Sequence, residues 1–531
     1  MEKYLIFSEK NPIYLLCGIL VVAIIFRLYN FDETIPLSMD AIQFFSYAAD
    51  ITTVGRLPEY YDIAKPGWSY VLAVIFSVFN FEQTMQYMQL QKLLAISISS
   101  LTIFPLFFLI KKFSTSKYSL LGVLLFAAEP GIIQNSLSGN SEPLFIFCMI
   151  STILLFLNKD SRIVYSSFLL AGIATIIRPE GLFLFIGISI CYIIRFRKKQ
   201  LVIPRYLLAL FIFILILLPV TIHKQQEGMY ETVFERAYLT LIKSDVYDED
   251  YKKILGTESD QLNSQNTKFN SVILGTEYFL KYLAWVSIPL FIIITPIGFI
   301  IFFKKFNVEK LIIFLLTIIM AIPAFYAYTF PLLETKYLYF LFPMFCLFST
   351  YSLRLFIERF HFKKILFGIC FVAIITSSIL FIDLQFDNTH ERESAFIARY
   401  VVENTKVVNA YQPESKYIFG FDVSKKWAEY KQLRNESESP GFTFWDTRQV
   451  WVKNPSNFES LESFLSNSER GNISHLVLDG KSDRSEFLNE IFYNEDRYEF
   501  LNKIYDSTDD GLEYHVKIFE VNYALFENGD I

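Results

Sequence analysis

The chain has 531 residues, of which 53% are hydrophobic, and its mean hydropathy is +0.35. Soluble globular proteins are less apolar than this, so the composition indicates that lipid surrounds much of the chain. The net charge of −6 is unevenly distributed, because residues 385–531 carry 27 acidic and 16 basic side chains, which leaves 27 acidic and 32 basic ones for residues 1–384. Cytoplasmic loops of membrane proteins require such an excess of Lys and Arg, so it gives no reason to expect nucleic-acid binding.

Eleven segments are apolar enough to be read as membrane-spanning helices. They lie near residues 13–29, 88–110, 118–134, 141–157, 163–177, 180–195, 204–222, 278–303, 309–329, 336–353 and 363–383. The first ends in FRLYNFDET, which offers a signal peptidase no pattern of small residues, so we expect this helix to be retained. The sequence therefore predicts a polytopic α-helical membrane protein with about eleven spans.

The charges of the connections predict the orientation of these spans. With a cytoplasmic N-terminus, five basic connections face the cytoplasm. They are KKFSTSK (111–117), NKDSR (158–162), RFRKKQ (195–200), KKFNVEK (304–310) and RLFIERFHFKK (354–364). The long loops 30–87 and 223–277 then face outward. Residues 65–81 are apolar but short, and counting them as a span would invert the later loops, so we expect a juxtamembrane helix there.

Residues 385–531 are expected to form a soluble extracytoplasmic α/β domain after a transmembrane domain of residues 1–384. Alternating apolar residues predict strands at 415–421, 473–480 and 514–521, with helices at 458–467 and 486–494. All five cysteines fall in apolar segments, so no disulfide is expected in this domain. No retention signal of the endoplasmic reticulum is evident, which favours the cell membrane of a prokaryote, archaeal or bacterial.

Ionisable side chains at the outer ends of spans are candidates for function, because charges at membrane depth are costly. They comprise Asp40, Asp62, Lys65, Glu129, Glu142, Arg178, Glu180, His223, Lys224, Glu334 and Lys336. Such a set suits the transfer of a sugar from a lipid phosphate, where cations stabilise the departing phosphate and one carboxylate takes the proton of the acceptor hydroxyl. A glycoside hydrolase would instead need two carboxylates across the scissile bond.

Four motifs occur in an order that resembles one family. They are MDAIQFFSYAADITTVGRLPEYYDIAKPGWSYVLAVIF (39–76), SEPLF (141–145), RPEGLF (178–183) and ETKYLYFLFP (334–343). Together they resemble the GT-C membrane glycosyltransferases, particularly the protein O-mannosyltransferase and aminoarabinose transferase branch of glycosyltransferase family 39. The resemblance covers about residues 10–385. The chain departs from the family at Ala41, which replaces a Glu, and at Gly67, which replaces the second Pro of a Lys-Pro-Pro element.

The resemblance implies a polyprenyl-phosphate sugar donor of the dolichyl-phosphate kind, inverting transfer on the outer face, and Asp40 as the catalytic carboxylate. We assign the donor phosphate to Lys65, Arg178 and Lys336. Supporting or acceptor-binding roles are assigned to Asp62, Glu142, Glu180, His223 and Glu334. The acceptor is a protein, a lipid or a glycan. The five His are scattered and the cysteines lie in spans, so no metal site is predicted, and a carboxylate-bound divalent cation stays open.

Each candidate also has a purely structural interpretation. Asp40 is well placed to cap the helix that follows it, and Lys65 to extend toward the lipid headgroups. Arg178 is equally well placed to anchor a helix end, and Glu180 to begin the next helix. Two other functions stay open: a transporter or flippase of lipid-linked sugars, which would need polar residues near the bilayer midplane, and a non-catalytic relative that binds such a lipid.

Overall fold

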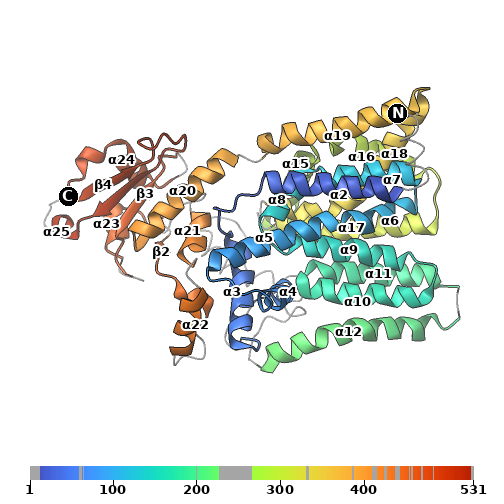
Figure 1. Cartoon of the computed structure of the whole chain (residues 1–531), viewed down its shortest axis with the longest axis horizontal. Coiled ribbons are helices and arrows are strands. Elements are labelled where there is room, and N and C mark those ends of the chain that lie inside the picture. Colours follow the sequence, from blue (N-terminus) through green and yellow to red (C-terminus); the bar gives the residue numbers. More distant parts are fainter. Residues whose placement is uncertain are drawn as a thin grey trace.

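The computed structural model describes residues 12–58, 63, 65–198, 200–226, 266–329, 334–385, 388–409, 415–423, 427–436, 443–453, 455, 458–467, 471–481 and 484–527. A bundle of long, roughly parallel helices is followed by a smaller part that contains a β-sheet (Figure 1). We call residues 12–385 the bundle region and residues 388–527 the sheet region.

The bundle consists of helices that coincide with all eleven segments predicted as spans. They are α2 (Pro12–Tyr29), α5 (Thr84–Leu101), α6 (Ile103–Lys111), α7 (Ser116–Ala127), α8 (Pro130–Leu137), α9 (Glu142–Phe156), α10 (Ser161–Ile177), α11 (Glu180–Phe196), α12 (Val202–Gln226), α15 (Asn266–Ser287), α16 (Phe291–Phe303), α17 (Val308–Thr329), η1 (Thr335–Leu341), α18 (Phe342–Arg359) and α19 (Lys363–Gln385). Four predicted spans each contain two consecutive helices.

Six helices of the described chain are long and apolar enough to cross a membrane, and eight if each strongly bent pair counts as one span. The bent pairs are α7 with α8, at 53°, and α15 with α16, at 102°. Helices α9 and α10 are apolar but shorter. These helices identify an integral, multi-pass membrane protein, and the number of eleven crossings stays a prediction.

The bend between α7 and α8 has a local cause. Pro130 occupies the first turn of α8, where its missing N–H is no loss, and Glu129 accepts a hydrogen bond from the N–H of Ile132 at 2.7 Å. Across the break, the buried guanidinium of Arg27 donates to the carbonyl of Ala127 at 3.2 Å. The last residues of α8 are thereby turned across the end of the bundle that faces the sheet region.

Two short helices, α3 (Met39–Val54) and α4 (Gly67–Phe76), pack on one another at this same end, between the bundle and the sheet region (Figure 1). Helix α3 ends at Gly55, whose φ of 73° is the left-handed conformation that favours glycine at a helix end. Helix α4 lies where the short juxtamembrane helix was expected.

The sheet region contains a five-stranded mixed sheet in the order β2-β1-β3-β5-β4, with β1 parallel to β2 and β3 and with β5 antiparallel to β3 and β4. Its strands are β1 (Val407–Asn409), β2 (Trp451–Lys453), β3 (His475–Leu478), β4 (Leu501–Asp506) and β5 (Lys517–Val521). Its helices are α20 (Asn388–Asn404), α21 (Ser415–Asp422), α22 (Trp427–Glu436), η2 (Phe444–Thr447), α23 (Leu461–Leu465), α24 (Glu486–Tyr493), η4 (Glu495–Arg497) and α25 (Tyr523–Phe526).

Four of the five elements predicted here are present, and one prediction was wrong. Strands β3 and β5 and helices α23 and α24 lie inside their predicted ranges. Residues 415–421, predicted as a strand, form α21 instead. The buried residues Tyr417 and Ile418, and Phe421, which packs against the same core, are spaced as one helical face, and so short an apolar run does not distinguish the two periods.

The sheet region packs on α3 and α4 through an aromatic cluster. Its members are Phe45, Phe76, Tyr87, Trp427, Tyr430 and Phe444. The ring of Trp427 stacks on Tyr87 at 4.2 Å, and its main-chain N–H donates to the carbonyl of Glu82 at 3.0 Å. A Cβ on Gly420 of α21 would come within 2.7 Å of the carbonyl of Leu37. Close backbone contact therefore holds the sheet region against the loop that precedes α3.

A buried carboxylate lies beside this cluster. Asp50 of α3 is 2% exposed, and its Oδ1 accepts hydrogen bonds from the N–H of Phe444 at 2.8 Å and from the hydroxyl of Tyr430. Its Oδ2 is buried without a partner in the described chain. Burial raises the pKa of Asp50 to about 7, against the lowering effect of its hydrogen bonds and of Arg434.

Asp50 is therefore expected to make stability depend on pH. A raised pKa in the folded state gives stability that is complete below the ordinary value of 3.8 and is lost as the pH rises through about 7. We expect thermal unfolding of the wild type to shift downward between pH 5 and 8, and Asp50→Asn, which cannot ionise, to be more stable at pH 8 by about 2–4 kcal/mol. Asp509→Asn, at an exposed position, is the control. Identical pH dependence in the wild type and Asp50→Asn would contradict the assignment.

Candidate active site

Asp40 is the second residue of α3, and its carboxylate binds a lysine rather than capping the helix. The N-cap position is Ser38, which makes no side-chain cap hydrogen bond. Instead, Asp40 Oδ2 lies 2.8 Å from the ammonium nitrogen of Lys336, which is 296 residues away along the chain. The structure thus does not support the simple capping interpretation of Asp40.

Lys336 joins two carboxylates. It lies in η1, just before α18, and its Nζ contacts Glu334 Oε2 at 2.5 Å as well as Asp40. Its side chain is 18% exposed, whereas those of Asp40 and Glu334 are 42% and 55% exposed. Glu334 and Lys336 thus form an ion pair, and Asp40 shares its cation.

Arg178 lies at the junction of α10 and α11 between two buried carboxylates. Its Nη1 lies 2.6 Å from Glu142 Oε1, and its Nη2 lies 2.7 Å from Glu180 Oε1. The guanidinium also lies over the ring of Phe340 at 5.2 Å. The Arg178 side chain is only 2% exposed, so it does not reach outward as a headgroup anchor. Glu142 Oε2 is buried without a hydrogen-bond partner in the described chain.

Lys65 is brought beside Arg178 by the glycine that departs from the family pattern. A Cβ on Gly67 would come 2.8 Å from the main-chain nitrogen of Ile177, the residue before Arg178. The bare backbone at Gly67 therefore lets the start of α4 touch the end of α10. Burial and the neighbouring charge of Arg178 lower the pKa of Lys65, while Asp40 acts in the opposite direction.

The cations of the site keep Asp40 ionised. Burial by itself would raise the pKa of Asp40, but the ammonium groups of Lys336 and Lys65 outweigh it and hold this pKa below its ordinary value. Asp40 is therefore a carboxylate at neutral pH, as a proton acceptor must be. The site thus combines one ionised, partly exposed carboxylate with three clustered cations.

Position 41 is filled by a small side chain that is fully buried. Ala41 is 0% exposed, and its carbonyl accepts a hydrogen bond from Gln91 Nε2 at 3.0 Å. A side chain at this position is therefore directed into the protein. The carboxylate that shares Lys336 with Asp40 is Glu334, which directly precedes η1.

The sequence also singled out Asp62, His223 and Lys224. Asp62 lies outside the described residues. Within the described chain, His223 of α12 makes no hydrogen bond or ion pair with Asp40 or Lys336, and its Nε2 is buried without a partner. Lys224 donates to the main-chain carbonyl of Ile63 at 3.0 Å, so it fixes the segment that leads to Lys65.

Gly67 gives a testable effect on stability. A Cβ would meet main chain on the opposing helix, which cannot rotate away as a side chain would, so Gly67→Ala is expected to destabilise the protein by about 1–3 kcal/mol. The measurement is the thermal unfolding midpoint in detergent. The matched variant Gly368→Ala, where a Cβ meets nothing within 4 Å, should unfold at or above the wild-type temperature. Equal midpoints for the two variants would rule out the close approach.

No family model and no curated protein sequence matches the chain. Solved structures do. Archaeal oligosaccharyltransferase AglB from Archaeoglobus fulgidus, in complex with an inhibitory peptide and a dolichol-phosphate, matches with a TM-score of 0.52 and 12% identity over 93% of this chain and 73% of that one. ArnT from Cupriavidus metallidurans matches in the apo state, with a TM-score of 0.53 and 10% identity over 97% and 99% of the two chains.

The chain shares its fold with AglB and ArnT. ArnT bound to undecaprenyl phosphate matches with a TM-score of 0.50 and 10% identity, and covers 95% of this chain and 97% of that one. The GT-C resemblance inferred from the four motifs is therefore confirmed at the level of the fold.

The described residues include no candidate metal site. One AglB structure contains Zn and sulfate. In this chain, no group of three or more His, Cys, Asp or Glu side chains among the described residues is placed to hold a metal ion. Asp40 and Glu334 both contact the ammonium of Lys336. We therefore derive no chemical step through a metal.

Proposed function

We propose that the protein is a glycosyltransferase that moves a sugar from a polyprenyl phosphate to an acceptor hydroxyl, with inversion at the anomeric carbon. The observation that carries the proposal is an ionised, partly exposed carboxylate that contacts Lys336 and lies within the electrostatic influence of Lys65 and Arg178, at one end of a membrane-spanning bundle. The shared fold with AglB and ArnT, whose structures contain a dolichol-phosphate and undecaprenyl phosphate, supports the same class of donor.

Each group has a defined part in this reaction. Asp40 takes the proton of the acceptor hydroxyl while the oxygen of that hydroxyl attacks the anomeric carbon of the donor sugar. The bond from that carbon to the phosphate oxygen breaks on the opposite face, and its electron pair stays with the phosphate. Lys336, Lys65 and Arg178 stabilise the negative charge that develops there. No general acid is needed, because the phosphate is a good leaving group.

Donor binding also strengthens the base. In the free protein, Lys336 and Lys65 hold the pKa of Asp40 low, which makes it a weak proton acceptor. A bound phosphate compensates these positive charges, so the pKa of Asp40 rises when the donor is present. Asp40 thereby becomes a better base only when there is a sugar to transfer.

The connections of the spans support an extracytoplasmic site. Lys112 and Arg195 both donate to carbonyls of the turn at residues 157–158, so the basic connections gather at one end of the bundle. Arg178 and its two carboxylates lie at the opposite ends of α9, α10 and α11. By the positive-inside rule we place the basic end in the cytoplasm, and the site with the sheet region outside.

The test is consumption of the donor by the whole protein. Purified full-length chain in nanodiscs is incubated with a panel of radiolabelled polyprenyl-phosphate sugars, and loss of label from the lipid is followed with and without added acceptors. We expect one donor to be consumed. If a lipid binds and is never consumed, the protein is a non-catalytic relative. If none binds, the transferase proposal fails and the transporter hypothesis is reopened.

A further inference from the structure

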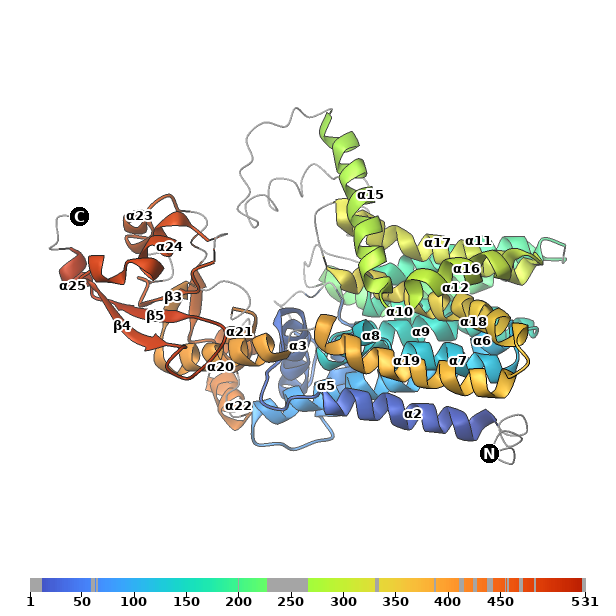
Figure 2. The same ribbon diagram turned by 90° about the horizontal axis from the view of Figure 1, so that it is seen from above.

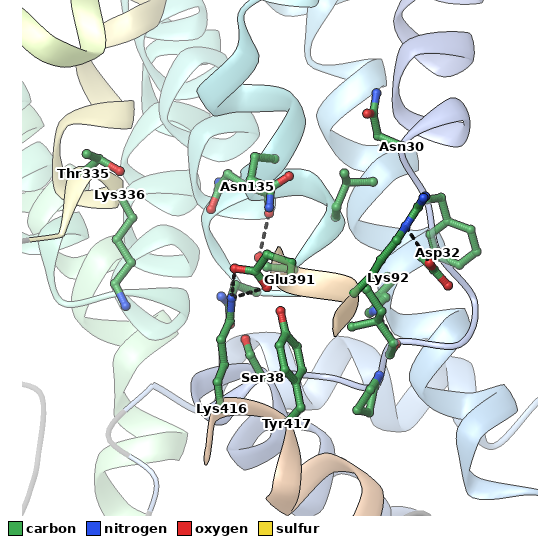
Figure 3. A pocket seen from close by; sticks show the side chains of 18 of the residues that line it. Asn30, Asp32, Ser38, Lys92, Asn135, Thr335, Lys336, Glu391, Lys416 and Tyr417 are labelled. Carbon is green, nitrogen blue, oxygen red and sulfur yellow. Dashed lines mark hydrogen bonds and ion pairs between the residues drawn. The ribbon is translucent and has the colours of Figure 1, made fainter. Parts of the chain in front are cut away.

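A chamber of about 390 Å³ lies between the bundle and sheet regions, next to the candidate active site. The bundle contributes Gln134 and Asn135 of α8 and Lys336 of η1. The sheet region contributes Glu391 of α20 with Lys416 and Tyr417 of α21. Figure 3 shows Asn135, Glu391, Lys416 and Tyr417 around the same space, with Lys336 on the opposite side from Asp32. Its volume is in the range of small-molecule sites.

The chamber borders on the catalytic carboxylate. Lys336 lines it and also contacts Asp40, and Ser38, two residues before Asp40, lines it as well. A molecule in the chamber can therefore present a group to Asp40 without crossing the protein. The residues that the sequence analysis missed are here. One of them, Lys92, lies four residues into an apolar predicted span, and a charge at such a position is a signal from which it could have been found.

Three of the four cations among the described residues that line the chamber are paired with carboxylates. Lys416 pairs with Glu391 at 2.8 Å, and Arg392 pairs with Asp32 at 3.1 Å. The ammonium of Lys92 donates to the carbonyl of Ile35 at 2.6 Å. Lys336 is assigned to the donor phosphate, and a second anion in the chamber would have to displace the carboxylates from Lys416 and Arg392, so the chamber suits an uncharged acceptor.

The remaining polar groups match hydroxyls. Side-chain amides of Gln134, Asn135 and Asn140 both donate and accept, as vicinal hydroxyls of a sugar do. Tyr339 and Tyr417 add two phenol groups, and Pro36 and Leu137 add apolar surface for the faces of a sugar ring. The lining comes from helices and loops in the part of the chain that is described, without the strand edge along which an extended peptide would pair.

We propose that this chamber binds the acceptor, that the acceptor is a neutral carbohydrate, and that one of its hydroxyls is presented to Asp40. The acceptor class rests on the proposed function, whereas the binding of a neutral carbohydrate by the chamber does not. The sheet region then acts directly in recognition, since Lys416 and Tyr417 form part of the wall.

Binding is tested without donor, on the full-length protein in nanodiscs, by isothermal titration calorimetry. The probes are a set of neutral trisaccharides of mannose, glucose, galactose and N-acetylglucosamine, a short uncharged peptide containing Ser and Thr, and mannose 6-phosphate. We expect a neutral trisaccharide to bind and the peptide and the phosphorylated sugar to bind more weakly. Preferential binding of the peptide or of mannose 6-phosphate would overturn the proposal, and so would the absence of binding by any trisaccharide.

Two conservative variants locate the binding. Asn135→Ala and Tyr417→Phe each remove one polar group and are expected to weaken trisaccharide binding about tenfold, as loss of one hydrogen bond to a ligand does. Matched controls are Asn404→Ala and Tyr493→Phe, at exposed positions of the sheet region, which should bind as the wild type does. Thermal unfolding of all four confirms that they are folded. Equal affinity in the chamber variants and the controls would overturn the site.

The two proposals fail in different ways. If a trisaccharide binds through Asn135 and Tyr417 but no donor is ever consumed, the proposed carbohydrate site stands and the proposed transferase activity is contradicted. If donor consumption depends on Asp40 but sugar is transferred only to the peptide, the proposed transferase activity stands and the proposed carbohydrate site is contradicted.

Discussion

Asp40→Asn is expected to lower sugar transfer by a factor of about 100 to 10,000, the range that a positioned general base contributes. The amide keeps the size of the side chain and its place beside Lys336, but it cannot accept the proton of the acceptor hydroxyl. The measurement is the initial rate of label transfer from the polyprenyl-phosphate sugar, with binding of the donor lipid determined separately. Donor binding should change far less than the rate.

Glu334→Gln separates the base from the ion pair. Glu334 contacts the same ammonium as Asp40 and has a more exposed side chain. If the carboxylate of Asp40 is needed only to hold Lys336, the two variants should lose similar activity. We expect Glu334→Gln to lose about tenfold or less, the size of a partly exposed ion pair. Asp160→Asn, which removes a carboxylate at the basic end of the bundle but keeps a helix N-cap acceptor, controls for the loss of an acidic charge elsewhere.

The pH dependence of the rate provides a further check on Asp40. Because Lys336 and Lys65 hold its pKa below the ordinary range, the rate at saturating acceptor and limiting donor should stay constant until the pH falls below that range. A rate that declines already near pH 6 in this regime would show that the base is another group.

Arg178→Met is expected to destabilise the protein by about 3–5 kcal/mol, because it leaves Glu142 and Glu180 buried without their cation. It should also abolish donor binding, since one of the three phosphate contacts is removed. Thermal unfolding in detergent measures the first effect, and binding of the polyprenyl phosphate measures the second. Arg178 is buried, so solvent cannot replace the lost interaction.

A triple variant distinguishes the structural role of Arg178 from its binding role. Combining Arg178→Met with Glu142→Gln and Glu180→Gln removes all three charges, and replacing a whole buried charge cluster is close to neutral for stability. We expect the triple variant to regain most of the wild-type unfolding temperature and still to bind no donor. Recovery of both properties would mean that Arg178 serves only to hold the helices.

The sequence predicted those parts of the structure that depend on local composition. Membrane-spanning helices satisfy their backbone hydrogen bonds internally, so an apolar segment is enough to predict one, and every predicted span contains helix. Asp40, Arg178 and Lys336 were found for a related reason. A charged side chain near membrane depth costs free energy, so such residues at the ends of apolar segments are candidates for function. The prediction of a strand at 415–421 was wrong, because seven residues are too few to show whether apolar residues repeat with the period of a helix or of a strand.

Only the tertiary structure decided which charges meet. Lys336 bonds to Asp40 across 296 positions, Asp50 bonds to Tyr430 across 380, and Lys416 of the sheet region faces a chamber whose other wall is α8. The sequence by itself determined that the protein crosses a membrane and carries a charged cluster at one end of its spans. Which charged groups pair within that cluster depends on the distances between helices that are remote in sequence. Electrostatic and hydrogen-bond energies fall steeply with distance, so a local sequence pattern cannot predict these pairs.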